Sequence, residues 1–418
     1  MSEHTMKTPD DPTLRLPQAV AKRAVPLMAT GAVLLVAGIL LGTATPGGMK
    51  FAMGAYLTAF IYVLTIALGA LFFVLIQHLC RAGWSVTVRR VAELFMSTLP
   101  MLGLLFIPVL GTLFFGQGTL YKWDDPQWIQ DHHPEWATNS KGFYLQDWFF
   151  TLRALIYFGI WSFLARYYFQ TSRRQDETAE LRLTEKMQAL SGPGVILFAL
   201  SLSFAAFDWL MSMEPAWFST MFGVYIFAGG ILSALSGMLV TIFLLQRGGT
   251  IRDEVTVEHF HDFGKLIFGF ITFWTYIAFS QYLLIWYANI PEETFWFKYR
   301  QENGWTAISL LLPICHWLLP FIGTMSRHVR RRPALMCFWA CWILVVHFID
   351  IYWIVMPTVT HEMEIGLLGG ISGVLVSLLC TLGMIGLFIG GVLRSGESAP
   401  WIPVRDPRLH ESLAFHNL

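Results

Sequence analysis

The stretch FAMGAYLTAFIYVLTIALGALFFVLIQHL, residues 51–79, decides the fold class of this chain. It contains no Asp, Glu, Lys or Arg. A helix needs only about 20 mainly apolar residues to cross the ~30 Å hydrocarbon core of a bilayer. Helices and closed barrels are the structures that satisfy their backbone groups in lipid, and the absence of apolar–polar alternation here favours a helix. We therefore expect residues 51–79 to span a membrane.

Nine other segments share this length and composition. The 418 residues are 55% hydrophobic and only 13% charged, and the mean hydropathy is +0.54. These values are typical of an all-α, multi-pass membrane protein, and we treat residues 1–418 as one polytopic membrane domain. The ten expected membrane helices are 25–44, 51–79, 91–116, 147–169, 193–213, 219–246, 263–288, 305–325, 334–356 and 364–393.

The distribution of positive charge predicts the orientation. Of the 28 Lys and Arg residues, 20 fall on one side of this topology and five on the other. Because cytoplasmic loops carry an excess of Lys and Arg, we expect the first side, and with it both termini, to be cytoplasmic. Between spans four and five, Leu183, Met187 and Leu190 share one helical face, which predicts a short amphipathic helix at the interface over residues 173–190.

Ionisable residues inside spans are costly and often mark ion or proton paths, so we singled them out. In spans two to five, His78 and Glu93 lie near the cytoplasmic face. Arg153 and Asp208 lie toward the outer face on consecutive spans, where we expect an ion pair.

Spans six to nine repeat this arrangement. Asp262 and Lys265 begin span seven at the cytoplasmic side, and His316 lies near the middle of span eight. His347 and Asp350 are three residues apart and share a face of span nine, with Asp350 toward the outside. The recurring series predicts a proton path, with the gaps bridged by water and by three further polar side chains: Tyr225, Tyr276 and Gln281. The alternative is that each residue is a satisfied interhelical hydrogen bond or ion pair.

No motif for a redox cofactor, a metal or a catalytic group is present. The five cysteines include no CxxC pair or iron–sulfur pattern, and no two membrane helices carry the paired histidines of a b-type cytochrome. No nucleotide-binding loop or nucleophile elbow is found. We therefore expect this chain to bind no cofactor and no metal itself and to have no catalytic residues of its own.

Two segments resemble a known family. These are DWLMSMEPAWFSTMFGVYIFAGG (208–230) and DFGKLIFGFITFWTYIAFSQYLLIWYANIPEET (262–294). They are similar to the ActF-type membrane subunits of bacterial alternative complex III, a quinol:electron-acceptor oxidoreductase of respiratory chains. The resemblance places the chain in the NrfD-like, or polysulfide-reductase-like, membrane superfamily.

The resemblance implies an architecture, partners and a location. The architecture is two four-helix bundles, at 51–213 and 219–356, with peripheral helices at 25–44 and 364–393. The partners are subunits of the ActA, ActB, ActC, ActD and ActE types, which carry haem c and iron–sulfur clusters, together with membrane lipids and a terminal oxidase. The location is the bacterial cytoplasmic membrane. The chain itself is implied to bind no redox cofactor and no nucleic acid, and to be a candidate for coupled proton movement.

Two other functions stay open on the sequence. In one, the chain is the quinol-binding membrane anchor of a molybdopterin and iron–sulfur reductase-type complex, with Asp208 and its neighbours holding quinol. In the other, the chain is a secondary transporter. Transporters tend to have helices broken at matching midplane positions, and spans six and seven show no such break.

Overall fold

The computed structural model describes residue 8 and residues 10–116, 118–137, 139–361, 363 and 370–417. Within these residues the structure is helical without β-strands, and ten helices are long and apolar enough to cross a membrane. The expected all-α, multi-pass fold is therefore confirmed. The first six residues of the predicted span 364–393 lie outside the described residues.

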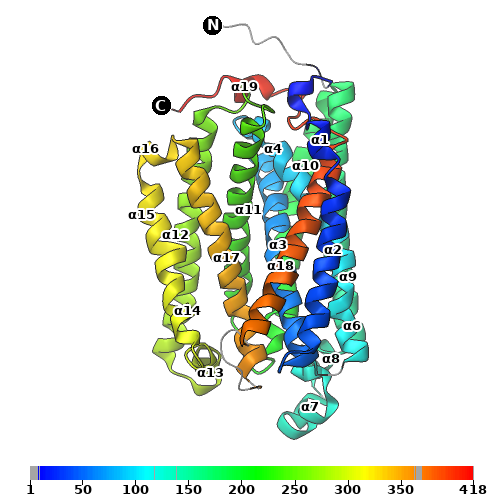
Figure 1. Ribbon diagram of the computed structural model, residues 1–418, viewed down its shortest axis with the longest axis vertical. Coiled ribbons are helices and arrows are strands. Elements are labelled where there is room, and N and C mark those ends of the chain that lie inside the picture. Colours follow the sequence, from blue (N-terminus) through cyan, green and yellow to red (C-terminus); the bar gives the residue numbers. More distant parts are fainter. Residues whose placement is uncertain are drawn as a thin grey trace.

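The long helices are arranged side by side along one axis, as Figure 1 shows. In chain order the spans are α2 (Ala24–Thr43), α3 (Gly48–Leu79), the segmented span α4 (Val86–Met96), α5 (Leu99–Leu105) and α6 (Ile107–Phe115), then α9 (Asp147–Thr178), α10 (Leu181–Trp209), α11 (Phe222–Arg247), α12 (Val257–Ala288), the segmented span α14 (Trp305–Leu312), η5 (Pro313–Leu318) and α15 (Leu319–Met325), then α17 (Pro333–His361) and α18 (Gly370–Gly396).

Short helices cover the two ends. One end carries η1 (Pro12–Leu14), α1 (Gln18–Ala21), α16 (Arg327–Arg330) and α19 (Leu409–Leu413); we call it the terminal end. The other carries η2 (Lys122–Asp124), α7 (Pro126–His132), η3 (Pro134–Ala137), α8 (Ser140–Tyr144), η4 (Met211–Met213) and α13 (Pro291–Tyr299); we call it the loop end.

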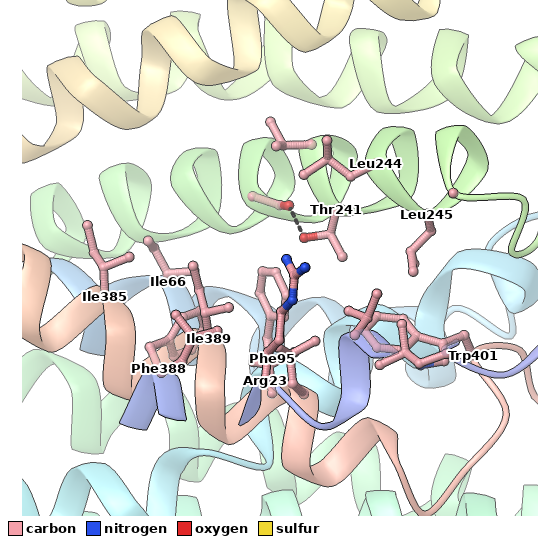
Figure 2. A pocket seen from close by; sticks show the side chains of 18 of the residues that line it. Arg23, Ile66, Phe95, Thr241, Leu244, Leu245, Ile385, Phe388, Ile389 and Trp401 are labelled. Atoms are coloured by element: carbon pink, nitrogen blue, oxygen red, sulfur yellow. Dashed lines mark hydrogen bonds between the residues drawn. The ribbon is translucent and has the colours of Figure 1, made fainter. Parts of the chain in front are cut away.

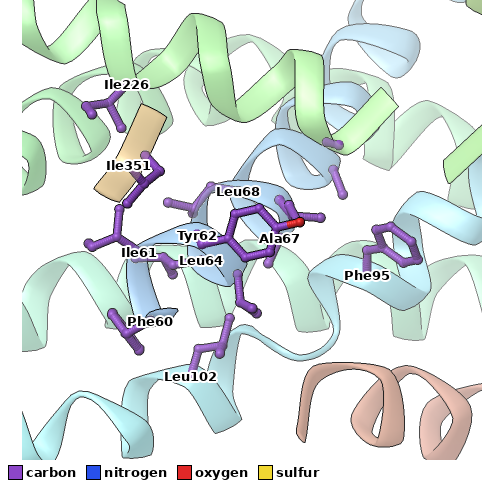
Figure 3. Close-up of a cluster of buried hydrophobic side chains, with 14 of the residues drawn as sticks. Phe60, Ile61, Tyr62, Leu64, Ala67, Leu68, Phe95, Leu102, Ile226 and Ile351 are labelled. Carbon is purple, nitrogen blue, oxygen red and sulfur yellow. The ribbon is translucent and has the colours of Figure 1, made fainter. Parts of the chain in front are cut away.

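Two helices, α3 and α11, form the centre of the molecule. Nearly all of the apolar stretch of α3 is buried, and it packs on α4, α10, α11, α17 and α18. Around it lie α4 to α6, α9 and α10, which with α3 we call the first half. Around α11 lie α12, α14 to α15 and α17, which with α11 we call the second half. Figure 3 shows the core between the halves, where Ile61 of α3 faces Ile226 and Ile351.

Glycine allows the closest helix approaches. A Cβ atom on Gly69 of α3 would collide with the carbonyl oxygen of Gly230 on α11, so the two central helices cross where neither carries a side chain. At the edge, α2 and α18 pack against each other over most of their length. There a Cβ on Gly31 would lie 2.6 Å from the Gly383 oxygen.

The structure corrects two local predictions. No separate interfacial helix forms at residues 173–190, because α9 runs to Thr178, the chain turns at Ala179 with φ +57°, and α10 begins at Leu181. Leu183 and Met187 are buried against the protein, so their apolar face serves packing rather than the membrane surface. In addition, α4 begins at Val86 rather than at residue 91. Arg89 and Arg90, which were expected in a loop, therefore lie in this helix and are buried.

Candidate functional site: two buried carboxylates

Asp208 and Arg153 meet as expected. Asp208, in the last turn of α10, is 1% exposed. Its carboxylate oxygens accept hydrogen bonds from Arg153 Nε at 2.7 Å and from Arg153 Nη2 at 3.1 Å. They also accept from the hydroxyls of Tyr144 and Tyr157, each at 2.8 Å. The carboxylate therefore has a paired cation and four donors.

The surroundings of Arg153 complete this site. Its Nη1 donates to the Tyr144 carbonyl oxygen at 2.7 Å, and its guanidinium lies 3.8 Å from the centre of the Tyr144 ring. A buried charge is costly unless it is both paired and hydrogen-bonded, and here both conditions are met. We interpret the pair as a fixed connection between α9, α10 and the loop-end helix α8.

Asp350 of α17 is equally buried but has different partners. It is 1% exposed and accepts hydrogen bonds from the Tyr225 hydroxyl and, at 3.2 Å, from Trp274 Nε1. His316 Nδ1 lies 3.9 Å from Asp350 Oδ2. In the part of the chain that the structure describes, no Lys or Arg forms an ion pair with Asp350. The site joins four elements of the second half: α11, α12, η5 and α17.

His316 lies in a π-helical turn, η5, which begins at Pro313. Such turns insert an extra residue into a helix and are frequent at functional sites. The histidine ring is fully buried against Trp274, with ring centres 3.8 Å apart. Neither ring nitrogen has a hydrogen-bond partner among the described residues.

His347 forms the second imidazole of the site. Its ring centre is 6.5 Å from that of His316, and its Nε2 lies 2.9 Å from Thr65 Oγ1. Because the one Thr65 hydroxyl hydrogen is donated to the Tyr62 carbonyl oxygen at 2.9 Å, we assign the His347 hydrogen to Nε2. Nδ1 is then an acceptor, and it has no partner among the described residues.

The structure corrects the predicted depths of these groups. We expected His316 at mid-span and Asp350 at a separate outer level, joined by bridging groups. The two instead lie in near contact. Of the expected bridging residues, Tyr225 is in the site. Tyr276 is 64% exposed, and Gln281 accepts a hydrogen bond from Ser219 instead.

At the terminal end, Glu93 belongs to a buried ion-pair network. It lies 3.4 Å from Arg89 Nε and 3.2 Å from Arg90 Nε. Arg89 also pairs with Asp406 and Arg90 with Asp176, each at 2.5 Å. The network therefore connects α4, α9 and the segment before α19. Nearby, His78 is buried with its ring centre 5.4 Å from that of Tyr168.

Asp262 and Lys265, also at the terminal end, form an ion pair with each other. Lys265 also donates to the Asn417 side chain at 2.8 Å. Asp262 and Trp274 are twelve residues apart on α12, which is about 18 Å at 1.5 Å per residue. Asp262 and Lys265 are therefore well separated from the Asp350 site.

Arg300 is a buried cation that the sequence placed in an outer loop. It donates to three backbone carbonyls, those of Trp296, Trp353 and Ile354, at 2.6–3.1 Å. The amide that would otherwise bond to the Trp353 carbonyl belongs to Pro357, which has no N–H, so Arg300 supplies the missing donor. Burial lowers the pKa of this guanidinium well below its usual value.

Comparison with known proteins does not assign the chain to a family. No protein-family model matches the chain, and no curated protein matches it significantly. The resemblance of residues 208–230 and 262–294 to a respiratory subunit therefore stays a prediction.

Proposed function

We propose that this chain is a cofactor-free membrane subunit of a quinol:electron-acceptor oxidoreductase of the alternative complex III type, and that its second half conducts protons. The observation that carries the proton role is the Asp350 site. A buried carboxyl group lies within 3.9 Å of an imidazole, and its hydrogen bonds come only from uncharged groups. This distinguishes it from a structural ion pair.

The chemistry of the site suits proton exchange. An imidazole can hold a proton on either ring nitrogen and can both donate and accept one, and His316 and His347 provide two such rings in one buried cluster. The unpartnered nitrogens of both rings are free to accept or pass on a proton. Asp262 at the terminal end is the proposed entry, and the separation of about 18 Å along α12 means that water must complete the path.

The place in a respiratory complex is supported by the sequence resemblance. In this proposal, subunits of the ActA to ActE types provide haem c and iron–sulfur clusters, and the complex lies in the bacterial cytoplasmic membrane. The present chain contributes helices, lipid contacts and proton-accepting groups.

The transporter alternative is not favoured by the helix interruptions. Span three is broken between α4, α5 and α6, and span eight contains the π-helical turn η5. In a chain of two equivalent four-span halves, span three corresponds to span seven and span eight to span four. Both α12 and α9 are continuous, so the interruptions do not match as transporter repeats require.

The test is the proton-to-electron ratio of the assembled complex in liposomes. His316→Leu and Asp350→Asn should leave quinol oxidation near the wild-type rate but lower the number of protons moved per electron. His328→Leu, at an exposed position of α16, is the matched control and should change neither quantity. Wild-type ratios in both site variants would contradict the proton role. Purification without cytochrome and iron–sulfur subunits would contradict the assignment to the complex.

A further inference from the structure

A long apolar cavity lies outside the two carboxylate sites. Its volume is about 590 Å³, and it lies between α2 and α18 on one side and α11 on the other, with α3 at its floor. Its lining is almost wholly apolar. Among the described residues that form it, Arg23 is the sole charged side chain.

The cavity opens sideways, toward the surface that faces lipid. Leu244 of α11 is 61% exposed and Ile389 of α18 is 43% exposed, and the two lie on opposite walls. Both belong to helices long and apolar enough to cross a membrane. A hydrocarbon chain would therefore enter it from the bilayer.

The length of the cavity matches one leaflet. On α11 the lining runs from Gly237 to Gly248. Gly248 directly follows Arg247, where α11 ends at the terminal end of the molecule. Eleven residues at 1.5 Å each correspond to about 16 Å, roughly half of the ~30 Å hydrocarbon core. One leaflet of acyl chains occupies this depth.

The single charged group among the described lining residues comes from the start of α2. Arg23 is the N-cap of α2, directly before its apolar stretch. Figure 2 shows its guanidinium extending from the α2 side toward Thr241, with Ile385 and Trp401 to either side. In the part of the chain that the structure describes, Arg23 has no ion-pair partner, and the buried indole N–H of Trp401 makes no hydrogen bond. A guanidinium is suited to bidentate binding of phosphate.

We propose that this cavity binds an anionic phospholipid, with one acyl chain along α11 and α18 and the phosphate on Arg23. An isoprenoid quinone has a similar apolar tail but brings no negative charge for Arg23, so the arginine favours the phospholipid. The inner wall is Tyr62, whose ring centre is 5.7 Å from that of His347. The acyl chain therefore ends next to the residue that separates the cavity from the histidine cluster and excludes water from that side.

The experiment uses the full-length chain, with any subunits that purify with it, in nanodiscs of phosphatidylcholine. The probe is phosphatidylglycerol with a photoreactive diazirine on one acyl chain, and cross-linked residues are mapped by mass spectrometry. We expect labelling of lining residues such as Val240 and Ile389. Arg23→Gln should reduce this labelling about tenfold or more, because it removes a charge-assisted hydrogen bond. Lys22→Gln removes the neighbouring charge, which does not line the cavity, and is the matched control.

A second pair of variants tests the cavity without touching the charge. Leu244→Trp narrows the cavity at an exposed position and should abolish labelling of α18. Leu284→Trp, at an equally exposed position of α12 outside the cavity, should not. Equal labelling of the wild type and Arg23→Gln would overturn the proposal. So would preferential labelling by a quinone that carries the same diazirine, or labelling that disappears when another subunit covers α2 and α18.

Discussion

Asp208 and Asp350 are both buried aspartates on the last span of their half, but the groups that bind their carboxyl oxygens differ. Asp208 is bound by the Arg153 guanidinium and two tyrosine hydroxyls. Asp350 is bound by a tyrosine hydroxyl and an indole N–H, with an imidazole nearby. In both cases the basic group comes from the preceding span.

Under the proposed function, a buried aspartate with a basic neighbour serves a different purpose in each half. An arginine stays charged under all ordinary conditions, so its carboxylate partner is held as an ion and ties helices together. A histidine, unlike an arginine, can be neutral, so its carboxylate neighbour need not remain an ion. Burial alone therefore does not identify a functional carboxylate in a membrane, and the nature of the basic partner decides.

The largest effect is expected from breaking the first site. Arg153→Gln leaves Asp208 as an uncompensated buried charge, which typically costs about 3–5 kcal/mol. We expect a strongly reduced yield of monodisperse protein in fluorescence-detected size-exclusion chromatography. The double variant Arg153→Gln/Asp208→Asn removes both charges and should recover part of the yield. If the two losses simply add, the pair is not an energetic unit.

A smaller effect is expected at Arg300, the buried cation of the second half. Arg300→Gln leaves the Trp353 carbonyl, to which Pro357 cannot donate, without its donor, at about 1–3 kcal/mol for an unsatisfied buried group. Pro357→Ala restores an amide that can bond to the Trp353 carbonyl, so it should lessen the loss in the double variant. The measurement is the midpoint of unfolding in a titration with a denaturing detergent. An undiminished loss would show that Pro357 does not create the need for Arg300.

Asp350→Asn should be tolerated better than either arginine change. The asparagine oxygen still accepts from Trp274 Nε1, and its NH2 group can donate to the Tyr225 hydroxyl oxygen in place of the second carboxylate oxygen. No charge loses its partner, so we expect a cost of about 1 kcal/mol. Thermal unfolding followed by light scattering compares it with Asp208→Asn, which leaves Arg153 unpaired. The contrast between the two sites fails if Asp350→Asn is the more damaging change.

The sequence predicted those features that depend on spacing along one helix or between consecutive helices. Span lengths follow from the apolar runs, and Arg153 and Asp208 meet because α9 and α10 are consecutive and antiparallel. The contact between His316 and Asp350 was not predicted because the relative depth of residues on two neighbouring helices depends on how the helices pack, and periodicity along one helix does not reveal this.

Contacts between distant segments were also missed. The network around Glu93 joins residues of α4 to Asp176 and Asp406, which are 86 and 317 residues away from their arginine partners. Leu183 and Met187 form an apolar stripe that looks the same whether it faces lipid or protein, and only the tertiary structure shows that it faces protein. Arg300 does lie between two spans, but its burial was not predicted because its partners are backbone carbonyls, which carry no sequence signal.

The smallest predicted effect concerns a third carboxyl group, which tests whether the first half also contains an exchangeable proton. Asp124 lies at the loop end beside Asp147, the first residue of α9. Burial, followed by the neighbouring Asp147 carboxylate, raises the pKa of Asp124 to about 7 from its ordinary 3.8. The folded state thus binds this proton more tightly than the unfolded state does. The stabilisation is complete below pH ~4 and is lost as the pH rises through about 7.

Asp124→Asn replaces the carboxyl group with a neutral side chain of similar shape and removes this pH dependence. Between pH 5 and pH 8 the Tm of the wild type should therefore fall relative to that of the variant, by about 1–3 °C, because the group is only one contribution in a large protein. A constant difference in Tm across this range would show that the Asp124 and Asp147 carboxyl groups do not retain a proton. The buried carboxyl groups at the loop end of the first half would then all be ionised, as Asp208 is beside Arg153. The contrast with Asp350, which has no arginine or lysine partner among the described residues, would become sharper.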